Sequence, residues 1–100
     1  MNAQWKKGVL ELCVLSQLRE KDQYGYELTE RISGKLDVSA GTLYLVLKRL
    51  RDSGYLETYL VESSSGPARK YYHLTETGRK NAEADRADWL EFASKVEELL

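Results

Sequence analysis

The sequence predicts a mainly α-helical domain with one small β-hairpin and a long C-terminal helix. Apolar residues recur at helical spacing in three successive segments of the first half of the chain. Two segments rich in aromatic and β-branched residues then flank a Ser/Gly/Pro loop, which is typical of a hairpin. From residue 75 to residue 100 nothing interrupts a helix. We therefore expect three helices, a hairpin and a closing helix, in that order.

Length and composition favour a single globular domain. The chain has 100 residues, of which 42% are hydrophobic and 31% charged, a balance that argues against disorder and against a membrane protein. The N-terminal residues lack the pattern of a secretory signal, so we expect a cytoplasmic protein. Cys13 is the single cysteine and stands among leucines and valines. It is expected to be buried and inert.

The net charge of −1 hides an uneven distribution along the chain. Residues 1–38 are balanced, residues 39–74 hold five basic and three acidic side chains, and residues 75–100 hold four basic and seven acidic ones. A polyanion would be attracted to the middle segment. The acidic last segment suits solvent or another protein.

The first three helices can be placed from local signals. A largely apolar stretch predicts a buried helix over 6–20, and a repeat of every fourth residue predicts a second helix from Tyr24 to about Gly34. Ser39 offers an N-cap for a third helix, which Gly54 closes. The core stripe of this third helix is Leu43, Val46, Leu47 and Leu50.

The opposite face of the third helix carries polar groups that burial does not require. Tyr44, Lys48 and Arg51 lie at i, i+4 and i+7, with Arg49 on the flank. These side chains could bind phosphates. The alternative for the three basic residues is a solvated helix face.

The hairpin is predicted from strands near 55–61 and 69–74, and Thr75 is the expected N-cap of the last helix. We divide the chain at this point, with residues 1–74 as one unit and residues 75–100 as a dimerisation helix. This last helix would be about 39 Å long, so it must project or find a partner. The partner we expect is a second copy, because one stripe has nearly heptad spacing: Ala82, Trp89, Phe92, Val96 and Leu99.

The order of elements is that of a winged helix-turn-helix, in which the third helix enters the major groove and the hairpin is the wing. Residue identities sharpen this interpretation. Six segments resemble the signature of the PadR family in order and spacing: Tyr24-Gly25-Tyr26-Glu27-Leu28, Gly41-Thr42-Leu43-Tyr44, Lys48-Arg49-Leu50, Ser53-Gly54-Tyr55-Leu56, Gly66-Pro67-Ala68-Arg69-Lys70-Tyr71-Tyr72 and Leu74-Thr75-Glu76-Thr77-Gly78-Arg79. The resemblance covers residues 7–100. One departure is Leu45, where the family usually has proline, which could alter the pitch of the recognition helix.

The resemblance implies a transcriptional regulator that binds double-stranded DNA as a homodimer and represses at a pseudo-palindromic operator. Tyr26 is assigned to DNA, with a core position as an equal alternative, and a solvated loop is the alternative for the two basic residues of the wing. The expected DNA-binding residues are Tyr26, Ser39, Thr42, Tyr44, Lys48, Arg49, Arg51, Gly66, Arg69 and Lys70.

Relatives in the family bind flat aromatic or phenolic compounds at the dimer interface. The resemblance therefore implies an effector site formed by Trp5, Val9, Trp89 and Phe92. Ordinary packing is the alternative for Trp89, because a large aromatic at helical spacing is more often core. The expected dimer interface is Trp89, Phe92, Val96 and Leu99.

An enzyme, a cofactor site and a metal site are not expected. His73 is the single histidine and has no partner at a catalytic spacing, and no phosphate-binding glycine loop is present. One Cys and one His are too few for a typical metal site. Two non-enzymatic alternatives stay open, namely a winged-helix module for protein assembly and a dimer that sequesters a small molecule without binding DNA.

Overall fold

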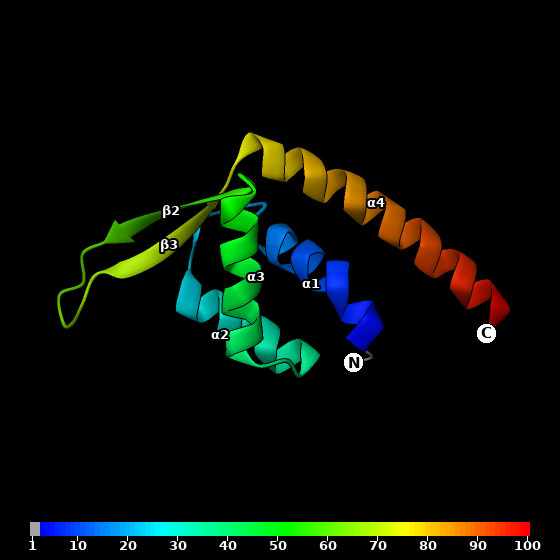
Figure 1. Cartoon of the computed structure of the whole chain (residues 1–100), viewed down its shortest axis with the longest axis horizontal. Coiled ribbons are helices and arrows are strands. Elements are labelled where there is room, and N and C mark those ends of the chain that lie inside the picture. Colours follow the sequence, from blue (N-terminus) through cyan, green and yellow to red (C-terminus); the bar gives the residue numbers. More distant parts are fainter. Residues whose placement is uncertain (1–2) are drawn as a thin grey trace.

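The computed structural model describes the backbone of residues 3–100 and the side chains of residues 8–100. The elements in chain order are α1 (Ala3–Gln17), β1 (Gln23–Tyr24), α2 (Gly25–Leu36), α3 (Ala40–Asp52), β2 (Leu56–Val61), β3 (Arg69–Leu74) and α4 (Glu76–Leu99). Figure 1 shows the β2–β3 hairpin extending to one side of the helices and the end of α4 to the other. This arrangement confirms the predicted class, which is mainly helical with a wing and a long last helix.

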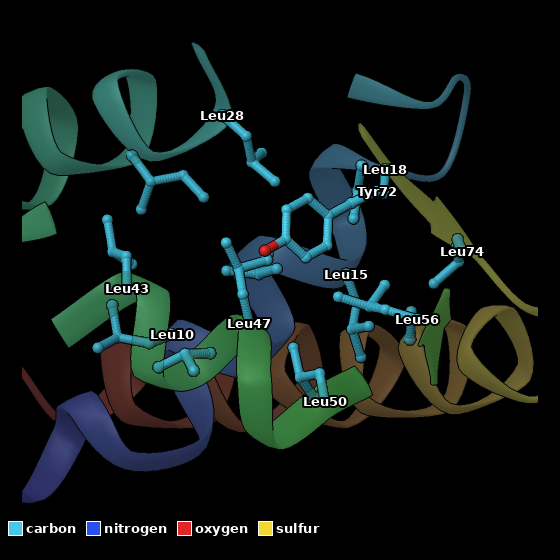
Figure 2. Close-up of a cluster of buried hydrophobic side chains, with 14 of the residues drawn as sticks. Leu10, Leu15, Leu18, Leu28, Leu43, Leu47, Leu50, Leu56, Tyr72 and Leu74 are labelled. Carbon is cyan, nitrogen blue, oxygen red and sulfur yellow. The ribbon is translucent and has the colours of Figure 1, made fainter. Parts of the chain in front are cut away.

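A core of leucines joins the first three helices to the sheet. The larger side chains with less than 2% exposure come from α1, the residue that follows it, α2, α3 and β2: Leu15, Leu18, Leu28, Leu43, Leu47 and Leu56. Figure 2 shows them converging around the ring of Tyr72. Burying each such side chain contributes about 1.5–3 kcal/mol. The core therefore fixes how α3 and the hairpin are placed relative to each other.

The ends of α3 are those predicted from the sequence. The hydroxyl of Ser39 accepts a hydrogen bond from the Thr42 amide at 3.1 Å. At the other end Gly54 adopts a φ of 83°, and the next amide, of Tyr55, donates to the carbonyl of Leu50 at 2.9 Å. A glycine in the left-handed region is the usual way to satisfy the last carbonyls of a helix.

The predicted end of α2 at Gly34 is wrong. The helix continues through Lys35 to Leu36, and Leu36 packs against the core. Asp37 takes the left-handed conformation instead, with a φ of 53°, and its amide donates to the carbonyl of Ser33. Aspartate tolerates this region better than most residues, so the chain can leave the helix at Asp37, after Leu36 has packed partly against the core.

The first helix was predicted over 6–20 and instead spans Ala3–Gln17. The additional strand β1 was not predicted. The helix ends at Gln17, because the chain then turns into β1. There the Gln23 side chain donates to the backbone carbonyl of Gln17. β1 has two residues, too few for a periodicity, and exists because it pairs with β3.

The antiparallel sheet has the strand order β1-β3-β2, and its two faces differ in character. Leu56 and Leu74 face each other across the hairpin and are buried in the core with Tyr72. At Gly25 a Cβ atom would lie 2.7 Å from the Tyr72 ring, so the start of α2 requires glycine. Alternation along the strands places Tyr71 and its neighbours on the outer face.

The first turns of α4 belong to the same core. Thr75 caps the helix as predicted, because its hydroxyl accepts from the Gly78 amide at 3.0 Å. Gly78 and Ala82 are buried. Ala82 therefore packs within its own chain, and its assignment to an intermolecular stripe is wrong. The molecule is 53 Å long because the rest of α4 continues past this contact.

Candidate nucleic-acid interface

The N-terminus of α3 presents two exposed hydroxyl groups. The oxygens of Ser39 and Thr42 are 2.9 Å apart, and both residues are exposed. They stand at the end of a helix where unpaired amides carry partial positive charge. This geometry suits a phosphate oxygen.

The exposed face of α3 is the one that the periodicity predicted. Tyr44 and Leu45 are 43% and 66% exposed, and Lys48 and Arg51 are also exposed. The opposite stripe of four apolar residues is buried. Leu45 replaces the proline expected from the family without interrupting the helix.

The basic residues of α3 differ in their partners. Arg49 donates to Glu11 of α1 through Nε and Nη2, at 3.1 and 2.9 Å, so its guanidinium is directed toward α1. Arg51 lies 3.4 Å from Asp52. Within residues 8–100 Lys48 forms no ion pair. Exposed ion pairs of this kind are worth about 0–1 kcal/mol, so both arginines can exchange a carboxylate for a phosphate at little cost.

The wing carries its basic residues at the base of the loop. Arg69 and Lys70 open β3 and are exposed, as is Gly66 in the loop. The guanidinium of Arg69 stacks 4.9 Å from the centroid of the Tyr24 ring. Lys70 lies on the opposite face of the strand from Arg69, which is the face that carries Tyr72.

A row of tyrosines crosses the outer face of the sheet. Tyr71 stacks on Tyr24 and Tyr59 with ring centroids 5.9 and 5.7 Å apart, and Tyr24 is 6.0 Å from Tyr26. Tyr26 is 56% exposed, so its alternative placement in the core is wrong. Tyr24, which follows the core spacing, is only half-buried. These rings fix the start of α2 to the wing.

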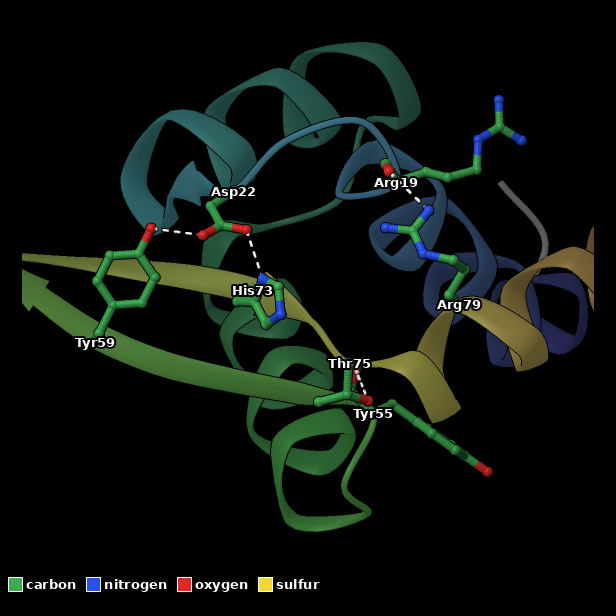
Figure 3. Close-up of polar contacts among 7 residues, drawn as sticks. All are labelled: Arg19, Asp22, Tyr55, Tyr59, His73, Thr75 and Arg79. Atoms are coloured by element: carbon green, nitrogen blue, oxygen red, sulfur yellow. Dashed lines mark hydrogen bonds and ion pairs between the residues drawn. The ribbon is translucent and has the colours of Figure 1, made fainter.

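Asp22 joins the two strands of the wing to the turn after α1. Its carboxylate accepts a hydrogen bond from the Tyr59 hydroxyl at 2.7 Å and contacts His73 Nδ1 at 2.8 Å (Figure 3). The Tyr59 hydrogen bond, with help from His73, lowers the pKa of Asp22 below its ordinary value despite partial burial. The same contact raises the pKa of Tyr59. The sequence prediction treated His73 as isolated. No local signal marked this pair, because Asp22 and His73 lie 51 residues apart and β1 is too short for a periodicity.

The second half of α4 leaves large apolar side chains uncovered. Trp89, Phe92 and Leu99 are 43%, 61% and 88% exposed. Trp89 and Phe92 line a cavity of about 330 Å³ with Ala93 and Val96.

A second cavity, of about 290 Å³, lies between α1 and α4 and brings Val9 and Leu12 close to Trp89. The structure thus places three of the four expected effector residues, Val9, Trp89 and Phe92, around adjoining cavities. The side chain of Trp5 lies outside the described residues.

Cys13 is half-buried rather than fully buried, and burial raises the pKa of its thiol. The described part of the chain holds no cluster of three or more His, Cys, Asp or Glu side chains suited to a metal ion. Within residues 3–100 every helix is too short or too polar to cross a bilayer.

Comparisons with known proteins agree with this geometry. Residues 14–84 match the model of the transcriptional regulator PadR-like family. The fold resembles the crystal structure of a PadR-like transcriptional regulator from Bacillus cereus, with 36% identity, 97% of this chain and 96% of that chain covered, and a TM-score of 0.85. It also resembles a transcriptional regulator from Streptococcus, with 33% identity, 98% of each chain covered and a TM-score of 0.85. A chain of Lysinibacillus sphaericus with no described function is 34% identical over 85% of this chain and 82% of its own length.

The family match covers well over half of the chain, and the resemblance derived from the sequence is confirmed. Proteins of this family are transcriptional regulators and not enzymes. The chain belongs to the PadR-like family of DNA-binding transcriptional regulators.

Proposed function

We propose that the chain is a homodimeric repressor that reads a pseudo-palindromic operator with one α3 helix from each copy. The observation that carries this proposal is the exposed face of α3, where Tyr44, Lys48 and Arg51 stand on a helix whose other face is locked in the core. Two such helices held about 34 Å apart would fit successive major grooves.

Individual residues then have distinct tasks. Lys48, Arg49 and Arg51 neutralise phosphates, and Ser39, Thr42 and Tyr44 contact phosphates or base edges at the start of the helix. Tyr26 contacts the backbone from the first turn of α2. The wing approaches the backbone or the adjacent minor groove with Gly66, Arg69 and Lys70.

We assign dimerisation to the end of α4. Residues 1–74 would form the DNA-binding unit, and residues 75–100 would pair with the same helix of a second copy. The support is the stripe of Trp89, Phe92, Val96 and Leu99, in which all but the half-buried Val96 are exposed, since an uncovered apolar patch of this kind marks an interaction site.

The adjoining cavities at Trp89 suit a small aromatic or hydrophobic effector. Such a compound would release the repressor if it binds the DNA-incompetent dimer more tightly than the competent one. Trp89→Leu should then abolish fluorescence quenching by planar aromatic compounds, whereas Leu90→Ala, about 100° around the helix and outside the lining of both cavities, should leave the quenching intact. Unchanged quenching in Trp89→Leu would argue for a site elsewhere.

DNA binding is tested by a salt titration. The protein is titrated into a labelled duplex from the region upstream of its own gene, and the logarithm of the affinity should fall linearly with the logarithm of salt concentration. Lys48→Ala should reduce this slope by about 1 and weaken binding to all sequences alike. Lys80→Ala, an exposed residue of α4, is the matched control and should behave like the wild type. A response that is flat with salt would contradict the proposal, and clean dimerisation without DNA binding would favour an assembly module.

A further inference from the structure

A third cavity lies between α1 and α2 and has no part in the proposed DNA or effector contacts. Its volume is about 260 Å³, and it is lined by Cys13, Gln17, Arg31, Ile32, Lys35 and Leu36. It shares no lining residue with the two cavities at Trp89. The two helices that form it lie next to one another in Figure 1.

The lining combines an apolar floor with two cations. Cys13, Ile32 and Leu36 are partly or fully buried, whereas Arg31 and Lys35 are exposed and lie one helical turn apart. No acidic side chain lines the cavity. The local charge is therefore positive beside an apolar surface.

Neutral groups hold Arg31 in place without cancelling its charge. Its Nη1 atom donates to the side-chain oxygens of Gln17 and Gln23, at 3.2 and 2.5 Å. Neither Arg31 nor Lys35 forms an ion pair with any carboxylate in residues 8–100, and the seven residues before that range include no Asp or Glu. A guanidinium has five N–H donors, so the donors on Nε and Nη2 stay available to an anion.

We propose that this cavity binds a small carboxylate with a short apolar body, such as a single ring or a short alkyl chain. The carboxylate would pair with Arg31 and Lys35, and the body would rest on Cys13, Ile32 and Leu36. Pockets for drug-sized ligands span about 300–1,000 Å³, and this cavity is smaller, which limits the body to that size.

The position of the cavity couples it to the recognition helix, a consequence that rests on the proposed DNA-binding function. Ser33, between Arg31 and Lys35, donates from its hydroxyl to the carbonyl of Val38 at 2.6 Å. Val38 is buried and precedes the cap of α3. A ligand that favours one tilt of α2 would therefore alter the angle at which α3 meets DNA.

The single cysteine of the chain makes this proposal testable without DNA. The rate of alkylation of Cys13 by iodoacetamide is measured at one alkaline pH with benzoate or hexanoate, and with benzyl alcohol or hexanol as neutral matches. Each carboxylate should slow alkylation saturably, with an affinity about tenfold or more above that of its neutral match, because charge-assisted hydrogen bonds are lost in the alcohol. Acetate should protect far less, since it lacks the apolar body.

Variants separate this site from DNA binding. Arg31→Gln should abolish the preference for the carboxylate, and Lys35→Gln, on an exposed position, gives the same test if the arginine variant fails to fold. Lys48→Gln should keep full protection while binding DNA more weakly. Equal protection by acid and alcohol, or no protection by either, would overturn the proposal. If the wild-type protein showed this protection but did not bind DNA, only the proposed DNA function would be overturned.

Discussion

At the residue scale, Gly25 and Gly78 stand where the chain passes too close to itself for a side chain. A Cβ atom at Gly78 would overlap the backbone carbonyl of Tyr55 and lie 2.8 Å from Leu74 Cδ1. That carbonyl accepts hydrogen bonds from both the amide and the hydroxyl of Thr75, so it cannot move away freely. The start of α4 therefore packs closely against Tyr55, in the turn between α3 and β2, because Gly78 has no side chain.

Gly78→Ala should lower the free energy of unfolding by about 1–3 kcal/mol, because overpacking forces the backbone apart. Gly34→Ala is the matched control, since nothing lies within 4 Å of its Cβ position inside α2. It should stabilise the protein by about 0.4–1 kcal/mol through the helix propensity of alanine. Urea denaturation measures both, and equal effects of the two changes would contradict the close contact.

Asp22 should make part of the stability depend on pH. Its pKa is lowered in the folded protein, first by the Tyr59 hydrogen bond and then by His73. Its contribution is therefore present above the unfolded pKa of about 3.9 and is lost as the pH falls through the lower folded value. At neutral pH Asp22→Asn should cost at most about 1 kcal/mol, since solvent screens a half-exposed group. Urea denaturation of both proteins should show the difference shrinking below pH 4, and an undiminished difference would contradict this assignment.

At the scale of an element, the N-terminus of α3 serves stability and recognition through the same hydroxyl. The Ser39 side chain caps the helix and also contacts the Thr42 hydroxyl. The two roles can be separated because an aspartate caps a helix as well as serine does, yet repels phosphate.

Ser39→Ala should therefore reduce the free energy of unfolding by about 1 kcal/mol. Ser39→Asp should keep the stability of the wild type but weaken DNA binding at low salt. Thermal denaturation and fluorescence anisotropy measure the two effects. If Ser39→Asp bound DNA as well as the wild type did, Ser39 would be a cap without a phosphate contact.

At the scale of the whole molecule, α4 works in two parts. Its first turns pack against the core, where Gly78 and Ala82 are buried. Its second half extends past the core with exposed apolar side chains. Phe92 is 61% exposed, so this chain alone gains little from it. Because the second half of α4 projects past the core, the molecule is elongated, with extents of 53, 28 and 21 Å.

Phe92→Lys should shift the protein to a monomer at micromolar concentration while the circular dichroism spectrum is preserved. The charge would have to be buried in the proposed interface, and a buried unpaired charge is costly. Ser94→Lys, about 200° away around the helix, should leave the assembly unchanged. Sedimentation equilibrium distinguishes these outcomes, and a Phe92→Lys protein that still dimerises would move the interface elsewhere.

The sequence by itself determined the elements whose signals are local. The stripe from Leu43 to Leu50, the caps at Ser39 and Thr75 and the left-handed Gly54 were all predicted, since each depends on residues within one or two helical turns. The strands of the wing followed from composition and from the loop between them.

Only the tertiary structure decided the features that join distant segments. Asp22 meets Tyr59 and His73 across 37 and 51 residues, and Arg49 turns to Glu11 across 38. β1 exists through its pairing with β3, and α2 runs past Gly34 because the core covers Leu36. No periodicity encodes such contacts, because their partners are brought together by packing of the leucine core and not by the spacing of residues along the chain.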